Sequence, residues 1–217
     1  MKVLIVDDHK LFAEAIRALL EEQGMEVWVA GGAEEALAAV RSQRPDLALV
    51  DLNMPGVGGM ELGRQILDQF PGIKVLALTA LEDPRAVTQA ARAGFHGYLM
   101  KDASMTEFVA SIRTAVNGGL FLAPHRLAAP AAGARTEEER HALLLADRLT
   151  SREREVLTML VQGATSRQIA RHLSIAPNTV RTHIQSILTK LQVHSRLEAA
   201  AFAVRYGLVR LPRGNGS

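Results

Sequence analysis

The sequence contains no cysteine, few aromatic residues and no long apolar run. The lack of cysteine excludes disulfide bonds, thiolate metal sites and a cysteine nucleophile. No apolar run approaches the roughly 20 residues that a membrane-spanning helix needs, so no membrane contact is expected. The opening residues, MKVLIVDDHK, place two acids where a signal peptide would stay apolar, which predicts a cytoplasmic protein.

The net charge of +2 over 217 residues hides an uneven distribution. Residues 1–120 carry 11 basic and 16 acidic side chains, about −5, and residues 121–147 are close to neutral. Residues 148–217 carry 11 basic and 3 acidic side chains, about +8. An acidic first half joined to a basic last third indicates a separate module that faces nucleic acid. A basic surface that is only solvated is the alternative.

Five short apolar runs alternate with amphipathic segments in the first half of the chain. The apolar runs are residues 3–6, 25–30, 46–50, 73–79 and 96–100, and the amphipathic segments are residues 11–23, 33–42, 60–70, 83–93 and 105–117. Apolar runs without clean alternation suit parallel strands that are covered on both faces. Gly24, Gly94 and Gly118 stand where helices should end. The pattern predicts an α/β domain over residues 1–118, with a doubly wound five-stranded parallel sheet.

Residues 119–147 are predicted to be a linker, because residues 123–135 are rich in Ala, Pro and Gly. Residues 136–149 are compatible with a helix and with an irregular connection. Residues 211–217 are predicted to be a disordered tail.

Residues 148–210 are predicted to form a small all-α domain of four helices. Capping-box spacings join Thr150 with Glu153, Thr165 with Gln168, and Ser195 with Glu198, as Ser104 and Glu107 do in the first half. A further helix should begin at Pro177, because proline suits the first helical position. Residues 165–191 then read as helix, short turn, helix, which is helix-turn-helix spacing.

Polar side chains follow the ends of four predicted strands. Asp7 and Asp8 follow the first strand, Asp51 ends the third, Thr79 ends the fourth and Lys101 follows the fifth. Parallel strands bring such residues to one edge of the sheet. Clustered carboxylates favour a hard divalent cation, for which Mg²⁺ is the best match. A cation, a lysine and a hydroxyl around a carboxylate would stabilise an acyl phosphate. For any single aspartate, a helix cap or a solvated loop is the alternative.

Residues 1–117 resemble the receiver domain of bacterial two-component response regulators. The motifs VDDH, DLNMPGVGGM, LTA and GYLMKD carry the resemblance. It implies a flavodoxin-like fold in which Asp51 accepts a phosphoryl group from a sensor histidine kinase. Pro55 and Gly59 would shape the loop that exposes this acid.

The same resemblance surrounds Asp51 with metal ligands, phosphoryl contacts and one switch residue. It assigns the Mg²⁺ ligands to Asp8, Asp51 and the backbone carbonyl of Asn53, with Asp7 acting through water. It assigns the phosphoryl contacts to Thr79 and Lys101, and the switch aromatic to Tyr98. A haloacid-dehalogenase-type phosphatase would need a second aspartate where Asn53 stands, and Asn53 cannot donate a proton. The chain is therefore not expected to be an enzyme beyond its own phosphotransfer and autodephosphorylation.

Residues 149–209 resemble the LuxR-type helix-turn-helix domain, which together with a receiver gives the NarL/FixJ family. The motifs LTSREREVLTMLVQG, SRQIARHLSIAPNTVRTHIQSILTKL and HSRLEAA carry this match, which implies binding to double-stranded DNA. Base contacts are assigned to Arg181, Thr182 and Gln185, and phosphate contacts to Arg167, Asn178, Thr179 and Lys190. A solvated helix face is the alternative for each residue. Ala176 replaces the usual capping hydroxyl, at a typical cost of about 1 kcal/mol.

The last helix, residues 195–206, is expected to expose Leu197, Ala200, Ala201 and Val204. The resemblance implies that part of this face pairs two DNA-binding domains on a two-fold site, and packing within the domain is the alternative. The sequence as a whole predicts a transcription factor that is switched by phosphorylation of Asp51 and dimerises when active. The alternative is a phosphorylation-independent DNA-binding regulator controlled by a ligand or a partner protein.

Overall fold

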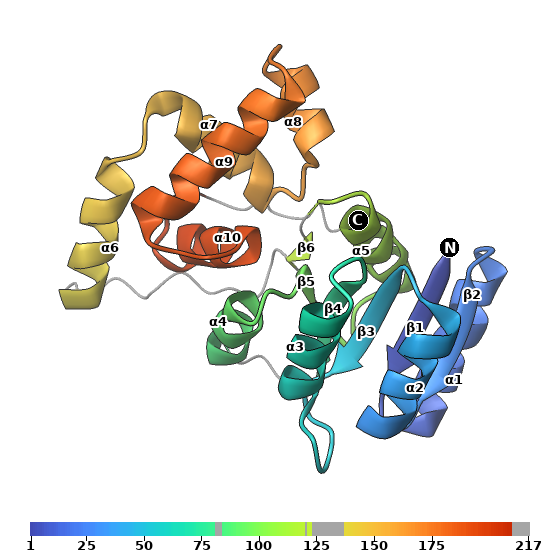
Figure 1. The fold of residues 1–217 in the computed structure, drawn as a ribbon. Helices are drawn as coiled ribbons and strands as arrows, with labels where there is room; N and C mark the ends of the chain where they lie inside the picture. Colours follow the sequence, from blue (N-terminus) through green and yellow to red (C-terminus); the bar gives the residue numbers. More distant parts are fainter. Residues whose placement is uncertain (81–83, 120, 123–136, 210–217) are drawn as a thin grey trace.

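The computed structural model describes residues 1–80, 84–119, 121–122 and 137–209. An α/β part is followed by a helical part, and the two lie against each other (Figure 1). The predicted disordered tail, most of the predicted linker and the start of the predicted helix at residue 83 lie outside the described residues. Within the described residues, no helix is long and apolar enough to cross a membrane.

The five predicted strands form one parallel sheet. They are β1 (Lys2–Val6), β2 (Glu26–Ala30), β3 (Leu47–Asp51), β4 (Lys74–Thr79) and β5 (Gly97–Met100). The strand order is β2-β1-β3-β4-β5-β6, the flavodoxin-like order with one addition. The addition, β6 (Phe121–Leu122), pairs with β5 and was not predicted, because a two-residue strand has no periodicity to detect.

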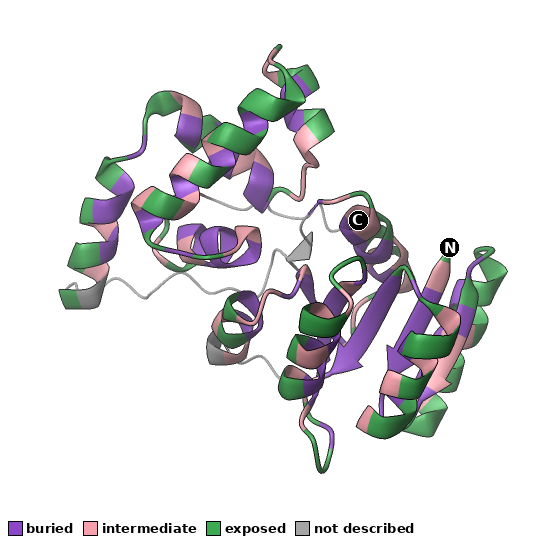
Figure 2. Cartoon of the chain, viewed as in Figure 1, coloured by how far each residue is buried: buried purple, intermediate pink, exposed green. Residues whose placement is uncertain are grey.

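Helices cover both faces of the sheet (Figure 1). Helices α1 (Lys10–Glu22) and α5 (Met105–Val116) pack on the face that carries Val3 and Leu47. Helices α2 (Ala33–Gln43), α3 (Gly59–Gln69) and α4 (Pro84–Arg92) pack on the face that carries Leu4 and Ala48. Successive strand residues point to opposite faces, so both sets are buried, and β1, β3, β4 and β5 are buried almost throughout, whereas the edge strand β2 is partly exposed (Figure 2).

The predicted helix ends are also in place. Gly24, Gly94 and Gly118 follow α1, α4 and α5 with positive φ, which costs glycine little. Ser104 and Glu107 form the reciprocal capping box that opens α5.

The helical part begins with α6 (Glu137–Asp147), so the undecided segment before residue 149 does form a helix. Four further helices follow as predicted: α7 (Ser151–Val161), α8 (Ser166–His172), α9 (Pro177–Leu191) and α10 (Arg196–Arg205). Helix α9 buries one face against its neighbours, through Val180, Ile184, Ile187 and Leu191. The 3.6-residue period of α9 leaves its other face to solvent.

Two of the three capping boxes in this part are complete. Those of α7 and α8 are reciprocal, whereas at α10 only the Ser195 hydroxyl accepts from the Glu198 amide. The Glu198 carboxylate accepts instead from the backbone N–H of His194 (2.8 Å). Helix α9 starts at Ala176 without a side-chain cap and with proline at its first position, as expected.

The expectation for the last helix was wrong on one point. Leu197, Ala200, Ala201 and Val204 were expected to be exposed, and all four are buried. They belong to an apolar cluster that runs from the sheet through α4 into the helical part. Helix α10 packs both on α7 and on α4, so this face is covered within the chain.

Candidate functional sites

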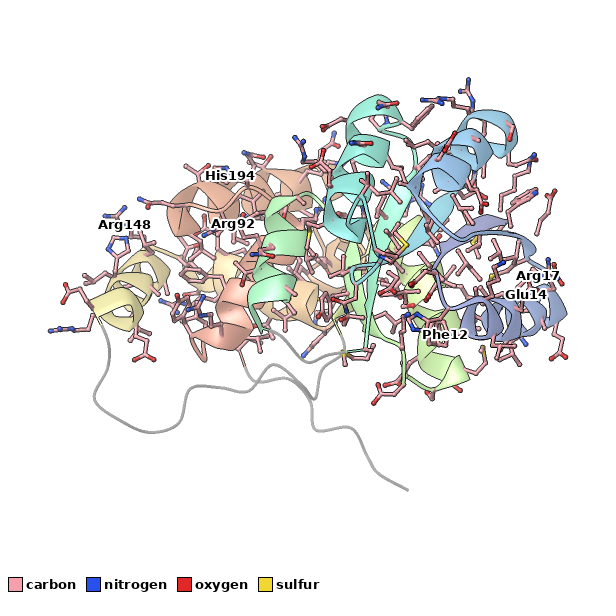
Figure 3. The ribbon with its side chains drawn as sticks, turned by 90° about the horizontal axis from the view of Figure 1, so that it is seen from below. Phe12, Glu14, Arg17, Arg92, Arg148 and His194 are labelled. Carbon is pink, nitrogen blue, oxygen red and sulfur yellow. The ribbon has the colours of Figure 1, made fainter. Side chains whose placement is uncertain are left out.

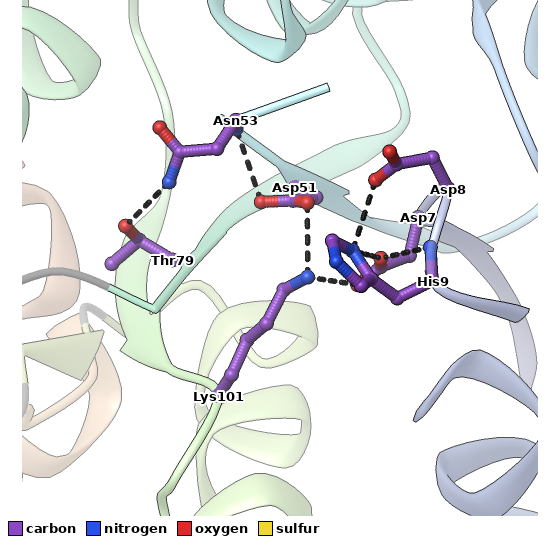
Figure 4. A network of polar contacts seen from close by, with 7 residues as sticks. All are labelled: Asp7, Asp8, His9, Asp51, Asn53, Thr79 and Lys101. Carbon is purple, nitrogen blue, oxygen red and sulfur yellow. Dashed lines mark hydrogen bonds and ion pairs between the residues drawn. The ribbon is translucent and has the colours of Figure 1, made fainter. Parts of the chain in front are cut away.

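Asp51 lies at the carboxyl edge of the sheet, where β3 ends. Its side chain is buried, with 1% exposed, and both of its oxygens have a partner. The backbone N–H of Asn53 donates to Oδ1 (3.1 Å), and the Lys101 ammonium donates to Oδ2 (2.9 Å). Figure 4 shows these contacts converging on the carboxylate.

Lys101 links two of the acids at this edge. Its Nζ lies 2.7 Å from Asp7 Oδ2 as well as 2.9 Å from Asp51 Oδ2. Burial by itself would lower the pKa of Lys101, but the contacts with Asp7 and Asp51 outweigh it, so the pKa of Lys101 is raised. The lysine therefore stays positively charged beside the carboxylate.

The acids fit a divalent cation. Ligand atoms of Asp7, Asp8, His9 and Asp51 lie within 4.8 Å of one another. Asp7 Oδ2 and Asp8 Oδ1 are both buried, and each has one nitrogen close by: Lys101 Nζ lies 2.7 Å from Asp7 Oδ2, and His9 Nδ1 lies 3.1 Å from Asp8 Oδ1. Buried carboxylate oxygens with free lone pairs are what Mg²⁺ would coordinate.

His9 is a member of this cluster that was not predicted. Its backbone N–H donates to Asp7 Oδ1 (2.9 Å), and its largely exposed ring contacts both aspartates. Its place directly after the two acids was the only signal in the sequence that could have indicated this role.

Thr79 and Tyr98 lie on the neighbouring strands β4 and β5. The Asn53 amide donates to the Thr79 hydroxyl (3.3 Å), a side-chain contact that was not predicted, and Thr79 is 2% exposed. Tyr98 stands on β5, beside Ala77 of β4, and is buried in the cluster that includes Val87 of α4. Tyr98 thus belongs to the apolar cluster that reaches α4, the helix on which α10 packs.

The outer face of α9 has the polar surface that the sequence predicts. Asn178, Thr179, Arg181, Thr182 and Gln185 are exposed, and Arg167 is exposed at the start of α8. The Arg181 guanidinium donates to the Asn178 side chain (3.1 Å), which holds the arginine along the helix. These donors and short hydroxyls match base edges and phosphates in chemistry.

Lys190 differs from the other members of this set. Its ammonium donates to both carboxylate oxygens of Glu153 (2.6 and 2.9 Å), so it points towards α7. Burial would raise the pKa of Glu153, but hydrogen bonds from Lys190 and Thr150 outweigh it and lower that pKa. A phosphate contact by Lys190 stays a prediction, and it would compete with this ion pair.

Contacts of α4 and α5 with the start of α10 join the two parts of the chain. The Ser195 hydroxyl donates to the carbonyl of Ala91 (2.7 Å), and the Arg196 guanidinium donates to that of Gly118 (3.1 Å). Arg92 Nε lies 3.3 Å from Glu198 Oε1. Figure 3 labels Arg92, which lies on α4. None of these pairs was predicted, because their members lie far apart in the sequence.

Two family models match the chain. They describe a "Response regulator receiver domain" over residues 3–113 and "Bacterial regulatory proteins, luxR family" over residues 147–203. The chain is 30% identical over 226 residues to the transcriptional regulatory protein DegU of Brevibacillus brevis, covering 97% of this chain and 96% of DegU. It is 35% identical over 211 residues to the response regulator GacA of Pseudomonas syringae, covering 96% of this chain and 98% of GacA.

A solved structure of the Salmonella typhimurium response regulator RcsB is similar with a TM-score of 0.52, covering 93% of this chain and 97% of that one. At 24% identity it supports the fold alone. The matched relatives are regulators of transcription rather than classical enzymes. The acidic site at the sheet edge, the helix-turn-helix and the two family matches together place this chain among the two-component response regulators that join a receiver domain to a LuxR-type DNA-binding domain.

Proposed function

We propose that a partner histidine kinase phosphorylates Asp51 and that this controls DNA binding by α9. The observation that carries the proposal is the geometry of Asp51, a buried carboxylate held by one backbone N–H and one charged lysine. An oxygen of Asp51 attacks the phosphorus of a phosphohistidine, the P–N bond breaks, and the imidazole leaves with its electron pair and takes a proton from solvent. The product is an acyl phosphate on Asp51.

The charges around Asp51 suit this transfer. Lys101 stands within hydrogen-bond distance of the carboxylate and would pair with the phosphoryl oxygens once they are present. Asp8, Asp51 and the carbonyl of Asn53 would hold Mg²⁺, with Asp7 acting through water. When bound, the ion would neutralise charge that develops on the phosphoryl oxygens. The Thr79 hydroxyl, now paired with Asn53, would turn to the phosphoryl group.

The switch would act on the contact between α4 and α10. A phosphoryl group adds up to about two negative charges beside Asp51, enough to shift an equilibrium worth a few kcal/mol. Thr79 and Tyr98 would carry the change to α4. Opening the contact would uncover the side of α10 that packs on α4. The residues that the sequence assigns to dimerisation, Leu197, Ala200, Ala201 and Val204, lie on this helix, and the uncovered part of it could then help to pair two domains on a two-fold DNA site while the receivers dimerise. The protein would encounter both the kinase and DNA in the cytoplasm.

The test uses acetyl phosphate with Mg²⁺, a Phos-tag gel and a DNA-binding assay on the full chain. Wild type should form a slower band and bind duplex DNA more tightly afterwards. Asp51→Asn should show neither change. Asp68→Asn, which removes an exposed acid from α3, is the matched control and should behave as wild type.

The opposite result would support a different mode of regulation. If Asp51→Asn responded to acetyl phosphate as wild type does, the proposed switch would be wrong. DNA binding without any phosphorylated band would favour control by a ligand or a partner protein.

A further inference from the structure

A cavity of about 630 Å³ lies between the two domains, at the edge of the sheet opposite to Asp51. Its receiver wall consists of residues that begin β4, precede β5 and follow α5. Its other wall comes from the starts of α8 and α10 and from α9. The backbones approach closely here, since a Cβ placed on Gly119 would lie 2.8 Å from the carbonyl oxygen of Gly163. The volume is that of a small-molecule site.

The lining of this cavity is basic. It includes Lys74, His96, Arg167, Arg181 and Arg196, and none of the described residues that line it is acidic. In the part of the chain that the structure describes, no carboxylate forms an ion pair with any of these four lysine and arginine side chains. Four positive charges thus share one cavity, and the described residues supply no counter-charge to them.

The electrostatic effects within the cavity agree with this picture. Burial and then the charge of Arg181 lower the pKa of Arg196. Burial, followed by the charges of Lys74 and Arg196, lowers the pKa of His96 to about 4, so His96 stays neutral at pH 7. Like charges held together in a partly buried space repel one another, and a multivalent anion would relieve that repulsion.

We propose that this cavity binds a di- or triphosphate group and that the bound anion holds the two domains together. Phosphate chains match the chemistry, because lysine and arginine donate charge-assisted hydrogen bonds to their oxygens. Arg167 and Arg181 also belong to the set that the proposed function assigns to DNA. An anion bound to these two arginines would therefore compete with DNA. This competition rests on the proposed function, whereas anion binding itself does not.

Isothermal titration of the full chain in Mg²⁺-free, phosphate-free buffer tests the binding. Tripolyphosphate should bind saturably at one site per chain. If ATP binds with the same affinity as tripolyphosphate, the cavity recognises the phosphate chain alone. If ATP binds more tightly, the protein also contacts the nucleoside. Adenosine, which carries no charge, should not bind.

Lys74→Gln is the decisive variant, because Lys74 lies outside the DNA-contact set and outside the α4–α10 contacts. It should weaken tripolyphosphate binding about tenfold, the effect of one charged hydrogen bond. Arg41→Gln removes the same charge from an exposed position of α2 and should leave the affinity unchanged. Equal losses in both variants, or titration without saturation, would overturn the proposal.

A competition experiment separates the two consequences. Tripolyphosphate should reduce binding of a fluorescent genomic duplex by wild type more than by Lys74→Gln, at matched ionic strength. Saturable binding without such competition would leave the anion site standing and refute its link to DNA.

Discussion

Gly59, the first residue of α3, stands directly against the end of β3, which carries Asp51. A Cβ placed on it would lie 1.7 Å from the carbonyl oxygen of Asp51 and 2.9 Å from the Cα of Leu52. Real Cβ atoms essentially never come closer than 3.0 Å to such atoms. The Gly59→Ala substitution must therefore push α3 and the end of β3 apart, because the obstacle is backbone and cannot rotate away.

Two effects of this displacement can be estimated. Forcing one carbon into a packed site typically costs about 1 to 3 kcal/mol, and a backbone obstacle favours the upper end. Movement of Asp51 by about 1 Å should also slow its phosphorylation by acetyl phosphate, by up to about 100-fold. Urea unfolding and the rate of band formation on a Phos-tag gel measure the two effects separately.

Gly58→Ala is the matched control. A Cβ on Gly58 meets nothing within 4 Å, and its φ of −60° suits any residue. This variant should lose no more than about 1 kcal/mol, because alanine is a poorer N-cap than glycine, and it should be phosphorylated at the wild-type rate. Equal behaviour of the two alanine variants would refute the claim that close packing of Gly59 positions Asp51.

Two further predictions concern groups whose pKa values are shifted. The folded chain keeps His96 neutral down to about pH 4, whereas the unfolded chain protonates it below about pH 6.5. Stability should thus fall as the pH drops through this window, by about 1.4 kcal/mol at pH 5.5 relative to pH 8. The urea midpoints at pH 5.5 and pH 8 should differ less for His96→Gln than for wild type. An identical difference in both proteins would show that His96 does not cause the loss of stability. Glu153→Gln keeps a capping side chain but releases Lys190, so the chain should lose about 1 kcal/mol of stability. Its DNA binding should depend more steeply on salt, by about one phosphate contact, and an unchanged salt slope would mean that Lys190 does not reach DNA.

Local sequence patterns were sufficient for the parallel sheet, for the helices of the last third and for the aspartates, Thr79 and Lys101 at the sheet edge, but not for His9. Apolar runs and helical periodicity determine the parallel sheet, and a parallel sheet must bring Asp7, Asp51, Thr79 and Lys101 to one edge. The exposed face of α9 follows from its 3.6-residue period in the same way. Each of these features follows from a local pattern and from the regular geometry of a helix or a parallel sheet, so the sequence alone was enough to predict it.

The relation between the domains was decided only by the tertiary structure. The bond from Ser195 to Ala91 and the pair of Arg92 with Glu198 join residues about a hundred positions apart, and no local pattern reports such pairs. The sequence could assign side chains of α10 to one face of the helix, but only the structure shows that this face is buried. The basic residues of the cavity lie together only because the two domains pack against each other. The physical reason is that local sequence shows whether a residue favours a buried or a solvated position. Which other residues it contacts depends on how the whole chain packs.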